Sequence, residues 1–151
     1  LKYEKNINRP LHILDFGCGR GKFIDMFLSM RQNVTAVDLN KDYVFAAQKK
    51  GISAFFPDDF FAKSKGEFDV ILLSHVIEHL NPEQLVELIP RLCGKLAQGG
   101  RLILVSPTLG ERFYHDFSHV RDYYFVLFLF LRKAKGRRSS TFEKVFCNIT
   151  A

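Results

Sequence analysis

A glycine-rich segment directly after a short apolar run most limits what this chain can fold into. Residues 11–16 (LHILDF) are typical of a buried strand, and residues 17–21 (GCGRG) follow at once. Glycine permits a tight turn and lets a ligand approach the backbone closely. Apolar side chains then recur at the spacing of one helical face: Phe23, Met26, Phe27 and Met30. This part of the chain predicts a strand, a glycine loop and a helix.

Short β-rich runs alternate with helical patterns up to residue 106. Further strands are expected at residues 34–37, 52–56, 70–73 and 101–105, the last of them after a turn at Gly99-Gly100. Asn40 should cap a helix that stops at Gly51. Asn81 should cap another through a box with Gln84, and Pro90 should kink or end its regular part. Alternating strands and helices predict a Rossmann-like three-layer α/β/α fold with a mostly parallel, twisted sheet.

The net charge of +6 is concentrated at one end of the chain. Residues 1–131 carry a net charge of +1, and residues 132–151 carry +5, mostly in the basic segment 132–138. Such a segment is more often a solvated tail than a binding surface. The distribution of charge therefore argues against nucleic acid as a partner.

Cysteine usage and apolar runs bear on the compartment. The three cysteines, Cys18, Cys93 and Cys147, are widely spaced and form no zinc knuckle, which favours a reducing, cytoplasmic setting.

The longest apolar run, residues 123–131, is shorter than the roughly 20 residues of a transmembrane helix. We therefore expect no transmembrane segment, and we interpret this run as core or as a homodimer interface.

Carboxylates at expected strand ends indicate the kind of ligand. Lys22 stands where the dinucleotide fingerprint G-x-G-x-x-G has its last glycine, and Asp15 lies just before the loop, with only Phe16 between them. A carboxylate there would repel a pyrophosphate and hold an ammonium group. Asp38 ends the second strand, where its carboxylate can accept hydrogen bonds from two ribose hydroxyls. Asp58, or its neighbour Asp59, can meet an adenine amino group, so the ligand matches S-adenosylmethionine.

The motifs together resemble those of class I S-adenosylmethionine-dependent methyltransferases. LDFGCGRG is similar to the family's glycine motif, VDLN to its ribose-binding strand end, and FDVILLSHVIEHL and LAQGGRLILVSPT to its next two strand regions. The resemblance implies a methionine pocket shaped by Asp15, Gly17, Cys18, Gly19 and Gly21. It also implies ribose and adenine contacts from Asp38, Leu39, Asp58 and Asp59, with Ser74 and His75 near the sulfonium. The implied product is S-adenosylhomocysteine.

A narrower likeness points to the methyl acceptor. DFSHVRDYY together with HVIEHLNPEQL resembles bacterial methyltransferases of surface-polysaccharide synthesis, including O-antigen chain terminators. The resemblance implies transfer to a small-molecule, sugar or lipid-linked acceptor, which we expect to be methylated at oxygen. Two alternatives stay open. One is an RNA or protein methyltransferase that uses the basic segment, and the other is a cofactor-binding module without activity.

The chain is expected to form one methyltransferase domain over residues 1–151, because this length builds a single core. We divide it into an N-terminal lead (residues 1–10) and a cofactor-binding core (11–106). An acceptor-side loop (107–122) and a C-terminal helix or strand (123–151) follow. A last strand is expected at residues 142–149. Truncated ends are also expected, since few residues precede the first strand and the C-terminal part leaves little room for the family's last strand pair.

Two histidines are candidates for a catalytic base. A hydroxyl acceptor needs one, and imidazole titrates near neutral pH, so His119 and His79 are the candidates. Residues 75–79 also match the H-x-x-E-H pattern of zinc peptidases, but their place after a buried strand opposes that interpretation. A divalent-metal cluster of Glu78, His79, Asp116 and His119 is a further alternative. We predict no metal.

Overall fold

The computed structural model describes residues 9–106, 118, 128–133 and 142–147. Its seven strands form one sheet in the order β3-β2-β1-β4-β5-β6-β7. They are β1 (His12–Phe16), β2 (Asn33–Val37), β3 (Ser53–Phe55), β4 (Phe68–Ser74), β5 (Leu96–Val105), β6 (Phe128–Lys133) and β7 (Phe142–Cys147). Strands β1 to β5 run parallel, and β6 and β7 are antiparallel to their neighbours. The Rossmann-like prediction is confirmed.

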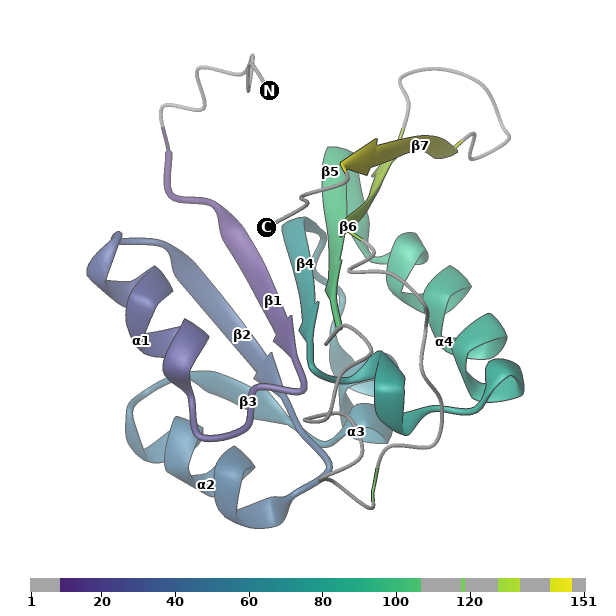
Figure 1. Cartoon of the computed structure of the whole chain (residues 1–151). Helices are drawn as coiled ribbons and strands as arrows, with labels where there is room; N and C mark the ends of the chain where they lie inside the picture. Colours follow the sequence, from purple (N-terminus) through teal and green to yellow (C-terminus); the bar gives the residue numbers. More distant parts are fainter. Residues whose placement is uncertain (1–8, 107–117, 119–127, 134–141, 148–151) are drawn as a thin grey trace.

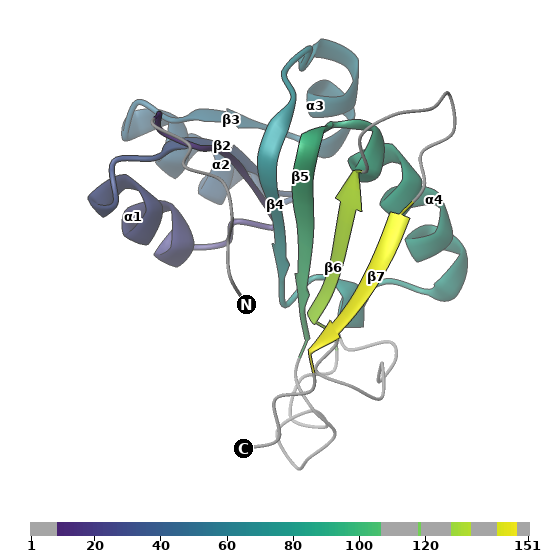
Figure 2. The ribbon, with the colours of Figure 1, turned by 90° about the horizontal axis from the view of Figure 1, so that it is seen from above.

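Helices cover both faces of this sheet. They are α1 (Lys22–Ser29), α2 (Lys41–Lys49), α3 (Pro57–Lys63) and α4 (Pro82–Gly94), with a 3₁₀ turn, η1, at Ile77–His79. Figures 1 and 2 show α1 and α2 on one side of the strands and α3 and α4 on the other. The core divides accordingly into one buried cluster around Phe60 and Leu92 and another around Ile24 and Val44. The reversal of strand order between β1 and β4 places the ligand crevice at their carboxyl ends.

The predicted helix caps are confirmed. The Asn40 side chain accepts a hydrogen bond from the Asp42 N–H at 2.9 Å. Asn81 and Gln84 form the reciprocal capping box, with distances of 2.8 and 2.9 Å. Pro90 does not end the helix, because α4 continues to Gly94. Packing of Leu92 and Cys93 in the core outweighs the single backbone hydrogen bond that proline removes.

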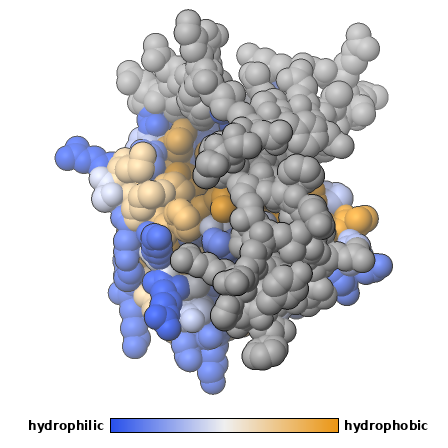
Figure 3. Space-filling view, in the orientation of Figure 1, coloured by the Kyte–Doolittle hydropathy of each residue, from blue (hydrophilic) through white to orange (hydrophobic). Residues whose placement is uncertain are grey.

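Helix α1 buries a different side from the one that its apolar periodicity indicates. Ile24 is 1% exposed and packs in the core, whereas Met26 and Met30 are 43% and 59% exposed. Figure 3 shows the resulting apolar surface on the side of the molecule where α1 lies. The periodicity therefore identified the helix correctly but not its buried face.

Several predicted boundaries were wrong. Strand β5 begins at Leu96 and includes the predicted turn Gly99-Gly100, with a register irregularity against β4. A Cβ on Gly100 would lie 2.7 Å from the Phe68 carbonyl oxygen, so glycine is required for the strands to approach. The pair β6–β7 also contradicts the expectation that the last strand pair lacked room.

The C-terminal part is described only in its strands. Residues 128–131 of the apolar run lie in β6, which pairs with β5 and β7, and residues 123–127 lie outside the described residues. Most of the loop 107–122 and of the basic segment 132–138 also lies outside them. The homodimer contact through residues 123–131 thus stays a prediction. Within the described part of the chain, no helix is long and apolar enough to cross a membrane.

A buried carboxylate ties β1 to β4 at the edge opposite the ligand crevice. Asp69 accepts two hydrogen bonds from the Arg9 guanidinium, at 2.8 and 2.9 Å, and one from the His12 N–H at 2.9 Å. Burial alone would raise the pKa of Asp69, but these three donors outweigh it and lower the pKa below its usual value. The ionised form is therefore stabilised by folding.

Replacing Asp69 by asparagine is expected to lower the free energy of unfolding by about 1–2 kcal/mol at pH 7. Because the folded-state pKa is depressed, this stabilisation is present above the unfolded pKa near 4 and is lost as the pH falls through the folded value. Urea unfolding at pH 7 and at pH 3 measures the difference. Glu87→Gln is the control. Glu87 forms an exposed ion pair with Arg91 at 3.6 Å, so its replacement should change the free energy of unfolding little at either pH. An equal loss of unfolding free energy in Asp69→Asn at both pH values would contradict the depressed pKa of Asp69.

Candidate functional site

The glycine loop between β1 and α1 is anchored to the carboxyl end of β2. The Gly17 and Cys18 N–H groups both donate to the Val37 carbonyl, at 2.7 and 3.0 Å, and the Gly19 N–H donates to Asp38 Oδ2 at 2.8 Å. Gly17, Gly19 and Gly21 have φ values of +88°, +51° and +86°. L-residues other than Asn and Asp seldom adopt such angles, which explains why glycine occupies all three positions.

The segment after β4 packs directly on this loop. A Cβ built on Gly17 would lie only 2.2 Å from Val76 Cγ2, whereas one on Gly19 would meet nothing within 4 Å. The absent side chain of Gly17 therefore makes room for Val76, and the open space at Gly19 lets another molecule approach the backbone. Sequence reasoning missed Val76, because no local pattern reports a contact between residues this far apart.

Asp15, the last residue but one of β1, is a buried carboxylate. It is 1% exposed, and neither carboxylate oxygen has a hydrogen-bond partner within the described part of the chain. Burial, together with the nearby Asp38 charge, raises the pKa of Asp15 to about 7. A buried ionisable group of this kind is costly for stability and is typical of functional sites, as expected for a residue that holds an ammonium group.

Asp38 and Leu39 stand at the end of β2, as predicted. Asp38 accepts from the Gly19 N–H with one oxygen and from the Asn40 N–H at 2.8 Å with the other. Each carboxylate oxygen can accept a second hydrogen bond, so two ligand hydroxyls can still be bound. Leu39 is 83% exposed beside it and offers an apolar surface to a flat ring.

The predicted adenine contacts lie in a helix rather than at a strand end. Strand β3 ends at Phe55, and Asp58 and Asp59 occupy the first turn of α3, where acidic side chains complement the helix dipole. Asp59 also pairs with Lys63 at 2.5 Å. The sequence missed α3, since Pro-Asp-Asp begins a helix as readily as it makes a turn. Both residues still lie at the carboxyl side of the sheet.

Four polar residues lie at and just after the end of β4: Ser74, His75, Glu78 and His79. Ser74 is buried, and His75 Nδ1 lies 3.1 Å from Glu78 Oε1. His79 Nδ1 lies 3.1 Å from both the carbonyl and the hydroxyl oxygen of Ser118. The structure thus brings His79 against the residue that precedes His119 in the chain. His119 itself lies outside the described residues, so its role stays a prediction.

The zinc-peptidase alternative does not fit this geometry. His79 ends a 3₁₀ turn, whereas His75 precedes it with φ +56°, so the two imidazoles do not share a face of one helix. Among the residues that the structure describes, no three His, Cys, Asp or Glu side chains gather as metal ligands. Asp116 and His119 of the alternative metal cluster lie outside that part.

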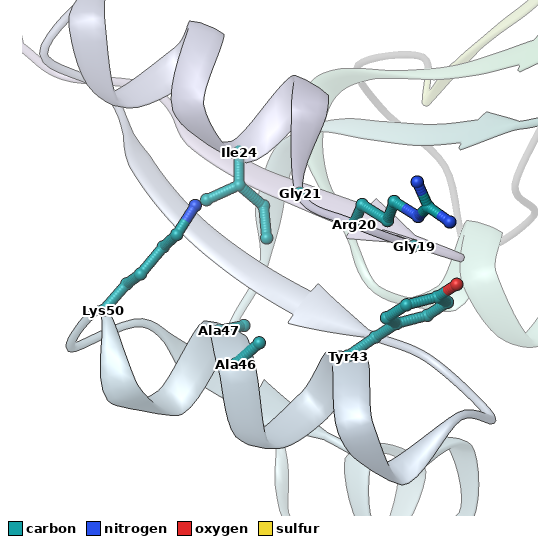
Figure 4. Close-up of a pocket in the computed structure, with 8 residues that line it drawn as sticks. All are labelled: Gly19, Arg20, Gly21, Ile24, Tyr43, Ala46, Ala47 and Lys50. Carbon is teal, nitrogen blue, oxygen red and sulfur yellow. The ribbon is translucent and has the colours of Figure 1, made fainter.

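A small hollow lies between α1 and α2 on the outer side of the glycine loop. Figure 4 shows its lining, to which Gly19, Arg20 and Tyr43 contribute at one end and Lys50 at the other. Lys50 is held there by Asp25 at 2.7 Å. Gly19 and Gly21 of the glycine loop line this hollow, whereas Asp15 and Asp38 do not, so it adjoins the candidate cofactor site without including its two carboxylates.

The family model of the methyltransferase domain matches residues 1–135. The chain belongs to this family. The methyltransferase resembles the ubiquinone biosynthesis O-methyltransferase of Caulobacter sp. (strain K31), with 30% identity over 105 residues, 64% of this chain and 40% of the relative. It also resembles the ribosomal protein L11 methyltransferase of Dechloromonas aromatica, with 29% identity, 67% of this chain and 34% of the relative. The chain thus spans less than half the length of these relatives.

A solved structure supports the cofactor. The S-adenosylmethionine-dependent methyltransferase from Archaeoglobus fulgidus shares 26% identity and a TM-score of 0.68, over 76% of this chain and 55% of its own. The unpartnered Asp15 carboxylate fits the ammonium group of S-adenosylmethionine, and Asp38 fits its ribose hydroxyls. Family membership and this geometry support S-adenosylmethionine as the cofactor, as the motifs indicated. The individual contacts stay predictions.

Cofactor affinity should fall as the pH falls below 7. A cation in the crevice favours ionised Asp15, whose pKa is raised to about 7, so binding below that value must release a proton. The dissociation constant should rise roughly 15-fold between pH 7 and pH 5.5 and approach tenfold per pH unit at the lower end of this range. Calorimetry with S-adenosylhomocysteine measures it, with Asp15→Asn as the control that lacks the titration. The same pH slope in both proteins would contradict the role of Asp15.

Proposed function

We propose that this methyltransferase transfers a methyl group from S-adenosylmethionine to a hydroxyl oxygen of a small-molecule acceptor. The observation that carries the proposal is the buried, unpartnered carboxylate of Asp15 beside the Asp38-anchored glycine loop. This arrangement suits a ligand with an ammonium group and ribose hydroxyls but no phosphate. The name of the Caulobacter relative, an O-methyltransferase, supports oxygen as the target.

The residues of the chain hold and orient the cofactor. Asp15 holds the ammonium group, and Asp38 accepts hydrogen bonds from the ribose hydroxyls. The open space beside the Gly19 backbone lets the cofactor approach. S-adenosylmethionine, when bound, supplies an electrophilic methyl group and keeps the carbon–sulfur electron pair on sulfur. Placing the acceptor oxygen in line with that methyl group lowers the barrier by orientation. His79 and His119 stay predicted candidates for the base.

A second candidate function is methylation of a protein, and it differs from this proposal in the class of methyl acceptor. A phenol, a sugar or a lipid-linked hydroxyl compound fits the proposal, whereas the relative named for ribosomal protein L11 favours a protein acceptor. A protein acceptor would be methylated at a neutral amine or a carboxylate, which already carries the lone pair that attacks the methyl group. The basic segment 132–138 could then hold an acidic partner.

Methyl transfer is tested with radiolabelled S-adenosylmethionine and three kinds of acceptor. These are a soluble catechol, a methyl glycoside and ribosomal protein L11. Asp38→Ala is the matched variant that should lose transfer to every acceptor. Transfer to a hydroxyl compound is the expected result. Transfer to the protein alone would replace the proposal with the second one, and no transfer despite cofactor binding would favour a binding module.

A further inference from the structure

The backbone of His75 is held in a conformation that histidine seldom adopts. Its φ of +56° lies in the left-handed region, where a non-glycine residue is strained. The His75 N–H donates to the Val105 carbonyl at 2.9 Å, so the end of β5 holds this conformation in place. Strain of this kind persists where the surroundings fix it and is frequent at functional sites. The histidine is therefore directed by the fold rather than by its own preference.

Glu78 supports this histidine from inside the protein. It is 0% exposed, its Oε1 lies 3.1 Å from His75 Nδ1, and its Oε2 is buried without a partner within the described residues. A fully buried carboxylate with a single, mostly exposed partner is a poor source of stability. Its position is better explained by what it does to the imidazole.

The contact determines which nitrogen of His75 faces solvent as an acceptor. If the Glu78 carboxylate acts as the acceptor, His75 Nδ1 carries the hydrogen and Nε2 presents a lone pair. The His75 side chain is 62% exposed, so Nε2 is accessible to a ligand. His75 also directly precedes Val76, which packs on Gly17 of the cofactor loop. His75 thus lies at the end of β4, next in the chain to a residue that contacts the glycine loop.

We propose that His75 and Glu78 form a dyad that removes the proton from the hydroxyl group of the acceptor. The inference rests on the proposed function, and it places the base at His75 rather than at His79. The hydroxyl proton moves to His75 Nε2 as the acceptor oxygen bonds to the methyl carbon and the carbon–sulfur pair stays on sulfur. Glu78 stabilises the imidazolium through Nδ1–H, and the exposed ring then releases the proton to water. Glu78 is a positioning residue.

The tautomer of His75 tests the dyad without any acceptor. Nitrogen-15 NMR of the full chain with bound S-adenosylhomocysteine should show His75 protonated at Nδ1, and its signal is identified by its loss in His75→Asn. Only five histidines contribute signals. Glu78→Leu should convert His75 to the Nε2–H form without lowering the melting temperature. An Nε2–H form in the wild type, or no change in Glu78→Leu, would overturn the dyad.

Kinetics test the role of the dyad in catalysis. His75→Asn suits the left-handed backbone, because asparagine tolerates it, and should lower kcat toward a catechol at least tenfold. Affinity for S-adenosylhomocysteine should change less than kcat. His12→Gln, at the amino end of β1 and therefore opposite the carboxyl ends of the strands, should leave both unchanged. Full kcat in His75→Asn would overturn the base role, whereas no transfer by the wild type to any hydroxyl compound would overturn the proposed function itself.

Discussion

Replacing Asp38 by alanine should weaken cofactor binding about 100-fold. Two hydrogen bonds from ribose hydroxyls to a carboxylate contribute roughly 1.5–3 kcal/mol each, and about 2.7 kcal/mol already corresponds to 100-fold. The variant also removes the acceptor for the Gly19 N–H at 2.8 Å, so the loop loses an anchor as well as the ligand contact. Asp38 thus acts on the cofactor twice, directly and through the loop.

Calorimetric titration with S-adenosylmethionine and S-adenosylhomocysteine measures this effect. Asp42→Ala is the matched control, because Asp42 is an exposed aspartate in the first turn of α2 that contributes only its backbone N–H to the cap. It should bind as the wild type does. Comparable weakening in both variants, or none in Asp38→Ala, would show that the ribose lies elsewhere.

Replacing Gly17 by alanine should lower the free energy of unfolding by about 3 kcal/mol. The left-handed φ of +88° costs an L-residue roughly 1–2 kcal/mol. The new methyl carbon would also lie 2.2 Å from Val76 Cγ2, and relieving such overpacking costs roughly 1–3 kcal/mol. Cofactor binding should fall too, because Val76 would be displaced from the loop.

Two companion variants separate these causes in urea unfolding. Gly19→Ala has a comparable backbone cost, with φ +51°, but meets no atom within 4 Å, so its loss should stay near 1–2 kcal/mol. Val76→Ala in the Gly17→Ala background should recover part of the loss, since the clashing methyl group is gone. Equal losses for Gly17→Ala and Gly19→Ala would mean that the contact with Val76 contributes nothing.

The order of elements could be predicted because each depends on local chemistry. The glycine loop, the Asn40 cap and the Asn81 box each act within a few residues, and all three are present as expected. Errors arose where a local pattern has two outcomes. Pro57 begins a helix where the sequence indicated only the end of a strand, and Pro90 is tolerated inside α4 because core contacts outweigh one lost hydrogen bond.

The amino-acid sequence by itself determined the strand-loop-helix order and the identity of the two carboxylates, Asp15 and Asp38, that indicate the cofactor. Only the tertiary structure decided what surrounds them. Burial of Asp15, the contact of Val76 with Gly17, and the pairing of His75 with a fully buried Glu78 all depend on strands packed side by side. Burial and charge–charge distances are properties of that packing, and no residue carries them alone.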